Sequence, residues 1–158
     1  MVTSSELLVP RLGLDFTAAA WLTSSTGEPA GKAAVAVKDV TVIACGCMVE
    51  MAVHASRTLE SEGLGVRVLN MHTIKPLDRE AVLQAATQTR GIVTAEEHHL
   101  TGGLGGAVAE LLAVEHPVRM RLVGMPDDFA VVGPTGPLRA RYGMSAEAIA
   151  MACRSLVL

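Results

Sequence analysis

From residue 33 onward, short apolar runs alternate with longer segments in which apolar residues recur every three or four positions. Runs such as "TVIACG", "VRVLNM" and "GIVTAEE" are nearly continuous and rich in Val and Ile, which is typical of strands buried on both faces. Segments such as "MVEMAVHASRTLESEG" have helical spacing and end at a glycine. The pattern predicts strands at residues 33–37, 39–46, 66–71, 91–97 and 118–124, and helices at residues 48–62, 76–89, 103–114, 137–143 and 145–157.

Two of the predicted helices begin with a suitable capping residue. Asp78 follows Pro76 at the start of one, and Ser145 precedes the last, with Glu147 in its first turn. Regular alternation of strands and helices with short connections predicts an α/β fold of three layers. In it, helices cover both faces of a mostly parallel sheet of about five strands.

Residues 1–31 do not share this regularity. They include the turn-rich stretch "STGEPAGK", and they carry Phe16 and Trp21 in a chain with only two Phe, one Trp and one Tyr. We therefore divide the chain into an N-terminal arm or linker, residues 1–31, and a domain, residues 32–158. Large apolar side chains on a free tail would remain exposed to water. We therefore expect the arm to lie on another surface.

Composition narrows the class of protein. The 158 residues suit one domain, and a mean hydropathy of +0.40 without any apolar run near the ~20 residues of a membrane helix indicates an interface rather than a membrane span. A net charge of −3 and the absence of a basic stripe give no reason to expect nucleic-acid binding. The lack of a signal-peptide pattern and the odd number of cysteines, three, favour the cytoplasm.

Cys45 and Cys47 are spaced C-x-C at the end of a predicted strand. Alternate strand residues point to the same face, so the two thiols are predicted to lie side by side. We interpret them as small buried side chains, with a metal or redox pair as the alternative.

The glycine-rich turn "TGGLGGA" joins a predicted strand to a helix. Its backbone amides and the helix dipole could hold an anion, but the glycines do not fit G-x-G-x-x-G and no P-loop Lys follows. The favoured interpretation is structural. Gly102 and Gly103 would make the turn, while Gly105 and Gly106 would let the helix lie close to the sheet.

An acid–histidine cluster, Glu96, Glu97, His98 and His99, ends the strand before this turn, where open α/β sheets place their ligands. Strand alternation lets only Glu96 and His98, or Glu97 and His99, converge, and two ligands do not make a metal site. His72, near Lys75, ends another strand without a catalytic constellation around it. We assign no catalytic, cofactor-binding or metal-binding residue, and interpret these as residues of an interface or of the mouth of a site: His72, Glu96, Glu97, His98, Gly102 and Gly103.

Four motifs resemble, in order, the C-terminal domain of transketolases. They are "DVTVIACGCMV", "VRVLNMHTIKPLD", "IVTAEEHHLTGGLGGAVAELL" and "VGMPDDFAVVGPTGPLRARYGMSAEAI", and the resemblance runs from about Gly31 to the end of the chain. "NMHTIKPLD" and "VTAEEH" followed by "GGLG" are especially similar to transketolases that bacteria encode as split subunits.

This resemblance implies a function for the assembly to which the chain would belong. Transketolases use thiamine diphosphate and a divalent metal, Mg²⁺ or Ca²⁺, to move two-carbon ketol units between sugar phosphates. Their active site lies between two other domains, one of which binds the diphosphate with a G-D-G…N motif and the other the pyrimidine. No Gly-Asp-Gly occurs in this chain. The resemblance therefore implies an assembly role in a homo- or hetero-oligomer, with the catalytic domains on partner subunits and no cofactor bound by this chain alone.

Two alternatives stay open. One is the corresponding component of a 2-oxoacid dehydrogenase or of a deoxyxylulose-phosphate synthase, against which "HTIKPLD" favours transketolase. The other is a non-catalytic interaction or regulatory module descended from the same domain.

Overall fold

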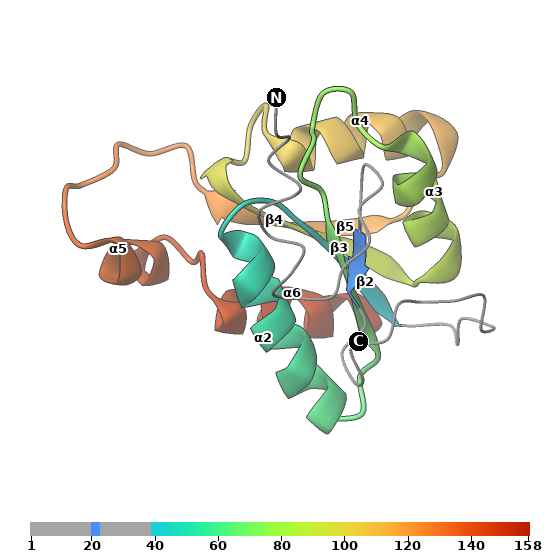
Figure 1. Ribbon diagram of the computed structural model, residues 1–158, viewed down its shortest axis with the longest axis horizontal. Helices are drawn as coiled ribbons and strands as arrows, with labels where there is room; N and C mark the ends of the chain where they lie inside the picture. The colour runs from blue at the N-terminus through green and yellow to red at the C-terminus, as the bar shows by residue number, and fades with distance from the viewer. Residues whose placement is uncertain (1–19, 23–38) are drawn as a thin grey trace, which may run out of the picture.

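A five-stranded sheet with helices on both faces forms the described part of the chain, residues 20–22 and 39–158 of a computed structural model (Figure 1). The elements follow one another as β1 (Ala20–Leu22), β2 (Val40–Ala44), α2 (Met48–Ser61), β3 (Val66–Asn70), α3 (Arg79–Gln88), β4 (Gly91–His99), α4 (Leu104–Glu115), β5 (Arg119–Met125), α5 (Thr135–Arg141) and α6 (Ala146–Val157).

The sheet has the strand order β1-β3-β2-β4-β5. The four strands from β2 to β5 are parallel, and β1 pairs antiparallel with β3, Trp21 lying opposite Leu69. The predicted α/β fold with a mostly parallel sheet is confirmed.

The edge of the sheet beside β3 contains part of the N-terminal arm. The predicted strand at residues 33–37 lies outside the described residues. Ala20–Leu22, which we had assigned to the arm, pairs with the domain's own sheet. These three residues therefore contact the same chain, whereas the arm was expected to lie on something else.

Four of the helices in the described part of the chain form two layers, one on each face of the sheet. Helices α2 and α6 lie together below the sheet in the view of Figure 1, and α3 and α4 lie above it. Alternation along each strand divides the core accordingly. Val42 and Val93 face α2 and α6, whereas Ile43, Leu69 and Ile92 face α3 and α4. Within residues 20–22 and 39–158, no helix combines the length and the apolar character needed to cross a membrane.

Both predicted helix caps are confirmed. The Asp78 carboxylate accepts a hydrogen bond from the Ala81 amide at 3.0 Å, and the Ser145 hydroxyl accepts one from the Ala148 amide at 3.2 Å. Each bond satisfies an amide that the first helical turn leaves without a partner.

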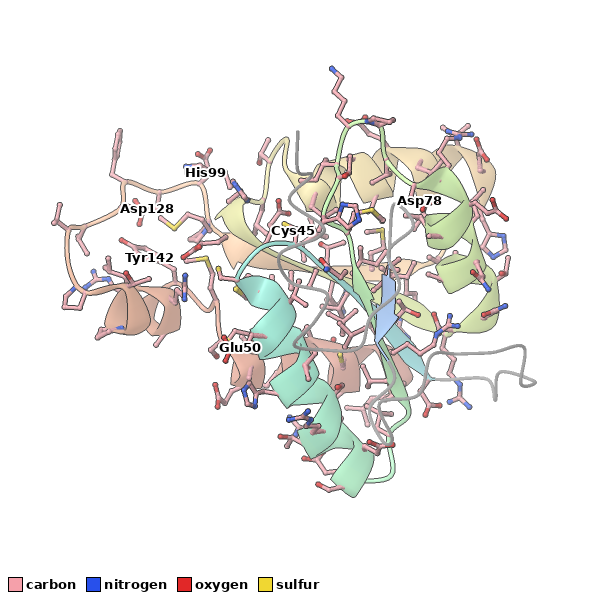
Figure 2. The ribbon with its side chains drawn as sticks, in the orientation of Figure 1. Cys45, Glu50, Asp78, His99, Asp128 and Tyr142 are labelled. Carbon is pink, nitrogen blue, oxygen red and sulfur yellow. The ribbon has the colours of Figure 1, made fainter. Side chains whose placement is uncertain are left out.

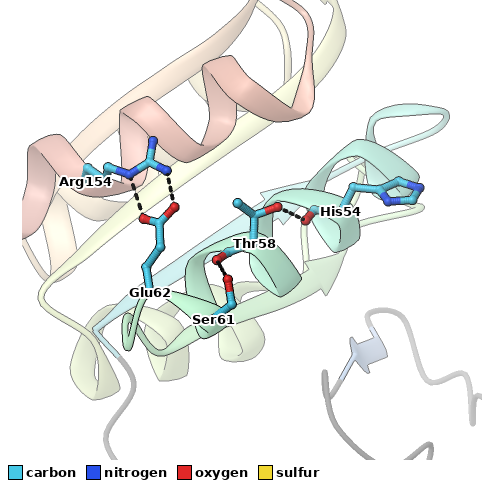
Figure 3. Close-up of polar contacts among 5 residues, drawn as sticks. All are labelled: His54, Thr58, Ser61, Glu62 and Arg154. Carbon is cyan, nitrogen blue, oxygen red and sulfur yellow. Dashed lines mark hydrogen bonds and ion pairs between the residues drawn. The ribbon is translucent and has the colours of Figure 1, made fainter.

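The end of α2 is tied to α6 across the surface. The Arg154 guanidinium donates to both oxygens of Glu62, at 3.0 and 2.7 Å (Figure 3). In the last turn of α2, the Thr58 hydroxyl donates to the His54 carbonyl and the Ser61 hydroxyl to the Thr58 carbonyl. The two-point contact fixes the relative position of two helices that cover the same face.

Candidate functional site

The parallel strands end at one edge of the sheet, and the candidate site lies there. In the sheet, β3 lies on one side of β2, and β4 lies on the other side. The direction in which successive strands are added to the sheet therefore reverses, and the point of reversal lies between β2 and β4. Open α/β sheets bind ligands outside the carboxyl ends of the strands at such a reversal. Here the Cys45 amide donates to the Ala95 carbonyl at 3.1 Å, which holds the ends of β2 and β4 together.

Glu96 is fully buried at this edge. One carboxylate oxygen accepts from the Leu104 amide at 2.6 Å, and the other accepts from the Gly105 amide at 2.8 Å. Both amides belong to the first turn of α4, whose N-cap residue, Gly103, has no side chain to bond them. The carboxylate therefore caps the helix and complements its dipole. The amides that follow the glycine-rich turn do bind an anion, and that anion is the Glu96 carboxylate of the same domain.

The glycines of the turn are explained by this cap. Gly102 has φ +80°, a left-handed conformation that favours glycine. A Cβ on Gly103 would lie 2.0 Å from a Glu96 carboxylate oxygen, and a Cβ on Gly105 would lie 2.5 Å from the Leu122 side chain. A Cβ on Gly106 would meet no atom within 4 Å. The structural interpretation is therefore supported for Gly102, Gly103 and Gly105. The prediction that Gly106 lets the helix lie close to the sheet is wrong.

Glu97 points to the other side of β4 and joins three elements. One carboxylate oxygen accepts from the Cys47 thiol, at the start of α2, at 2.8 Å, and the other accepts from the Arg139 guanidinium, in α5, at 2.6 Å. The bond from Arg139, followed by that from Cys47, lowers the pKa of the Glu97 carboxyl. Burial, and then the bond to Glu97, raises the pKa of the Cys47 thiol. This carboxylate thus links α5 and the start of α2 to the end of β4.

Cys45 and Cys47 lie on opposite sides of the sheet. Cys45 packs in the core beneath α3 and α4, and Cys47 packs against the core beneath α2 and α6. The predicted side-by-side placement is wrong because β2 ends at Ala44 and a left-handed turn at Gly46, φ +56°, follows. Burial, the charge of Glu96 and then that of Cys47 raise the pKa of Cys45 to about 11, which agrees with a structural thiol.

An open pocket of about 510 Å³ lies at the end of β4. Figure 2 shows His99 at the end of the molecule where Asp128 and Tyr142 also lie. The side chains of His98 and His99 are exposed there. The residues that line the pocket are Ile74, Glu96, Glu97, His98, His99, Thr101, Gly102, Gly103 and Met125.

Five of the six residues selected from the sequence line this pocket, and the sixth does not. His72 lies apart from it, exposed, with its ring Nδ1 2.8 Å from the Thr73 hydroxyl oxygen. Sequence reasoning missed Arg139, which lies 42 residues after Glu97 and carries no local signal of the contact.

The lining of this pocket determines which chemistry is open to this edge of the sheet. Among residues 20–22 and 39–158, no three His, Cys, Asp or Glu side chains gather so as to hold a metal ion. A diphosphate does not fit the start of α4, because Glu96 occupies the amides that would bind it and would repel it. The exposed part of the pocket offers imidazoles, a hydroxyl and a paired carboxylate, which suit contact with another polar surface.

Comparison with known proteins identifies the family of this domain. Residues 31–149 match the family model "Transketolase, C-terminal domain". A 6-deoxy-6-sulfo-D-fructose transketolase subunit, SqwH of Clostridium sp. strain MSTE9, is 45% identical over 118 residues, which are 75% of this chain and 37% of that protein. 1-Deoxy-D-xylulose-5-phosphate synthase 1 of Geobacter sulfurreducens is 47% identical over 121 residues, 75% of this chain and 19% of that protein.

Among solved structures, one described as a split gene transketolase, inactive β4 tetramer, is 41% identical. It superposes with a TM-score of 0.71 over 76% of this chain and 39% of that one. The chain thus spans well under half the length of these relatives. The match covers most of the sequence and agrees with the observed fold, so this chain belongs to the transketolase C-terminal domain family.

Proposed function

We propose that this chain is the C-terminal component of a split, transketolase-like enzyme that transfers two-carbon ketol units between sugar phosphates. The observation that carries the proposal is the 45% identity with a protein named as a transketolase subunit. The chain would act in assembly and domain arrangement, in the cytoplasm, and partner subunits would supply the catalytic domains. Alone it would be inactive.

Thiamine diphosphate and a divalent metal, Mg²⁺ or Ca²⁺, would be bound by those partner subunits. Two features support this assignment. The sequence has no Gly-Asp-Gly, and the amides at the start of α4 are bonded to Glu96. No step of the reaction is therefore assigned to a residue of this chain.

The carboxyl edge of the sheet is the proposed contact with the partner's catalytic domains. Glu96, Gly102 and Gly103 would act indirectly, by shaping the turn before α4. The exposed side chains of His72, Glu97 and His98 would make the contact, as interface residues or at the mouth of the site. The open pocket of about 510 Å³ supports this role, because polar side chains such as those of His98 and His99 are exposed at it and rims of protein interfaces are polar and hydrated.

The arm, residues 1–31, would complete the domain, residues 32–158, on the side of β3. Its residues 20–22 add an antiparallel edge strand. We propose that the apolar residues elsewhere in the arm contact a partner subunit. Burial of each large side chain there would stabilise the contact by about 1.5–3 kcal/mol. Deleting residues 2–30 should weaken that association tenfold or more.

Co-purification tests the proposed function. The chain would be co-expressed with the products of its neighbouring genes, and the purified complex analysed for thiamine diphosphate. We expect a complex that contains a chain with a G-D-G…N motif, holds the cofactor and transfers ketol units. Neighbours without that motif, and no captured chain that binds the cofactor, would instead favour a non-catalytic interaction or regulatory module.

A second candidate is a component of a deoxyxylulose-phosphate synthase. The 47% identity with the Geobacter sulfurreducens synthase favours it. Assaying the same complex for deoxyxylulose phosphate formation and for ketol transfer between sugar phosphates separates the two. The corresponding component of a 2-oxoacid dehydrogenase would give neither product.

A further inference from the structure

The segment between β5 and α6, residues 126–143, lies largely outside the core, and we call it the loop–α5 segment. In the view of Figure 1 it projects from the left end of the molecule as a long loop followed by α5. Residues 126–137 are all exposed, and α5 buries none of its residues. A helix of seven residues without buried side chains is not stable in water by itself. The order of α5 therefore depends on the contacts that hold it to the domain.

Arg139 makes both of the bonds that tie α5 to the domain. Its guanidinium donates to the Glu97 carboxylate at 2.6 Å, and its backbone carbonyl accepts from the Met144 amide at 2.8 Å. Among the residues that the structure describes, no other hydrogen bond or ion pair joins the loop–α5 segment to the rest of the domain. The ring of Tyr142, partly buried, adds an apolar contact with the core. One residue thus controls most of the attachment.

A hollow of about 170 Å³ lies beneath α5. Met125 and Met144 belong to the domain side of its lining, and Leu138 and Tyr142 belong to α5. With α5 in place, Met125 is 8% exposed and Met144 6% exposed. Glu97 and Met125 also line the pocket of about 510 Å³, so the two cavities adjoin. Without α5 they would form one groove with an apolar floor and an unpaired carboxylate.

We propose that the loop–α5 segment is a removable cover over this groove, and that Arg139 is the residue that holds it closed. Local unfolding of α5, with the rest of the domain intact, exposes Met125 and Met144 and frees Glu97. Order and disorder of a short segment is a known means of switching a binding surface.

The closed cover also competes with a partner. Arg139 occupies the carboxylate to which a basic side chain of another protein would bind, so α5 acts as an internal competitor for the contact. The identity of that partner, a catalytic subunit, rests on the proposed function. The cover itself is a property of the isolated chain and would remain if the chain were a regulatory module.

Amide hydrogen exchange of the isolated full chain tests the local unfolding. The amides of Leu138 and Tyr142 donate to carbonyls of Pro134 and Leu138, so their exchange reports the opening of α5. We expect them to exchange at least about a hundredfold faster than the amides in the middle of α6, because segments with few buried contacts open locally. Arg139→Gln should speed their exchange at least about tenfold further, through loss of a hydrogen bond between charged groups, and leave α6 unchanged.

Arg141→Gln is the matched control for this substitution. Arg141 is an exposed residue of the same helix, and the ion pairs of residues 39–158 do not include it. Its guanidinium lies 5.9 Å from the centre of the Tyr142 ring, a weak contact when exposed. The control should therefore change the exchange of α5 less than about threefold.

Methionine oxidation tests whether α5 covers the hollow. Hydrogen peroxide converts an accessible methionine to its sulfoxide, and mass spectrometry follows each residue separately. Arg139→Gln should oxidise at Met125 and Met144 several times faster than the wild type. Met48, which is fully buried, and Met151, which is 63% exposed, should oxidise at unchanged rates. Faster oxidation of Met48 would reveal unfolding of the whole domain, which would overturn the role of Arg139 in a local cover.

Competition is tested with a co-purified catalytic subunit. Arg139→Gln should bind it at least about threefold more tightly than the wild type, because a contact made only by a minor, open state has a reduced apparent affinity. Weaker binding would place α5 in the contact itself and overturn the competition.

Two results on the isolated chain would overturn the cover: amides of α5 that exchange as slowly as those of α6, or oxidation of Met125 and Met144 that Arg139→Gln and Arg141→Gln change equally. Failure to capture any catalytic subunit bears on the proposed function alone, since exchange and oxidation need no partner.

Discussion

Replacing Glu96 by Gln tests whether the buried carboxylate holds the start of α4. In the native domain its two oxygens accept from the amides of Leu104 and Gly105, at 2.6 and 2.8 Å. A Gln side chain keeps the shape but has one acceptor oxygen, and its NH₂ group would face the hydrogen of the second amide. The substitution therefore leaves a buried donor without an acceptor and removes a negative charge from the helix N-terminus.

The magnitude follows from these losses. A hydrogen bond to a charged group contributes about 1.5–3 kcal/mol, and a charge in a buried position at a helix terminus up to about 2 kcal/mol. Removing a buried charge also recovers its desolvation cost, which offsets part of the loss. We expect the free energy of unfolding to fall by about 2–4 kcal/mol. For a chain of this size, such a fall lowers the melting temperature by about 4–16 °C.

The assay is thermal and urea unfolding of Glu96→Gln beside Glu110→Gln. Glu110 lies on the same helix and is exposed, so its substitution should change the free energy of unfolding by less than about 0.5 kcal/mol. Equal stability of the Glu96 variant and the wild type would refute the reasoning. It would mean that the carboxylate contributes nothing beyond what a neutral amide provides at this helix end.

Three further predictions concern the same edge of the sheet. Gly103→Ala should lower the melting temperature, because its Cβ would collide with a Glu96 oxygen. Gly106→Ala, whose Cβ would meet no atom within 4 Å, should leave the melting temperature unchanged or raise it, and equal effects of the two substitutions would contradict the cap. Replacing Glu97 and His98 together by Ala should reduce the activity of the assembled enzyme about tenfold or less, since it weakens a contact rather than removing an acid or base; a loss beyond about a thousandfold in an intact assembly would identify a catalytic group. In Glu97→Ala, the thiol of Cys47 should react faster with a disulfide reagent and at lower pH than in the wild type. Burial and then the bond to Glu97 raise the pKa of this thiol, and the substitution removes the bond; an unchanged pH profile would argue against it.

The sequence was sufficient for those features that local patterns determine. The positions of β2 to β5 and of the helices followed from the period of the apolar residues. The caps at Asp78 and Ser145 followed from side chains that bond amides three residues away. The parallel arrangement followed from alternation and short connections. Each of these depends on residues near one another in the chain.

The candidate site was only partly predictable because it depends on distant contacts. Five of the six selected residues line the pocket, since strand ends in a parallel sheet lie together. The bond from Arg139 to Glu97 joins residues 42 positions apart, and no pattern indicates it. Cys45 and Cys47 were misplaced because the prediction extended the strand beyond Ala44, where the chain turns. Similarly, the three residues of β1 are too few to show a period.

A calorimetric titration of thiamine diphosphate, with Mg²⁺ present, tests the central claim most directly. The titration is made into the isolated chain and then into the chain combined with its co-purified partner. The account predicts no measurable heat of binding for the isolated chain up to millimolar cofactor, and saturable binding once the partner is present. Binding at micromolar affinity by this chain alone would contradict it.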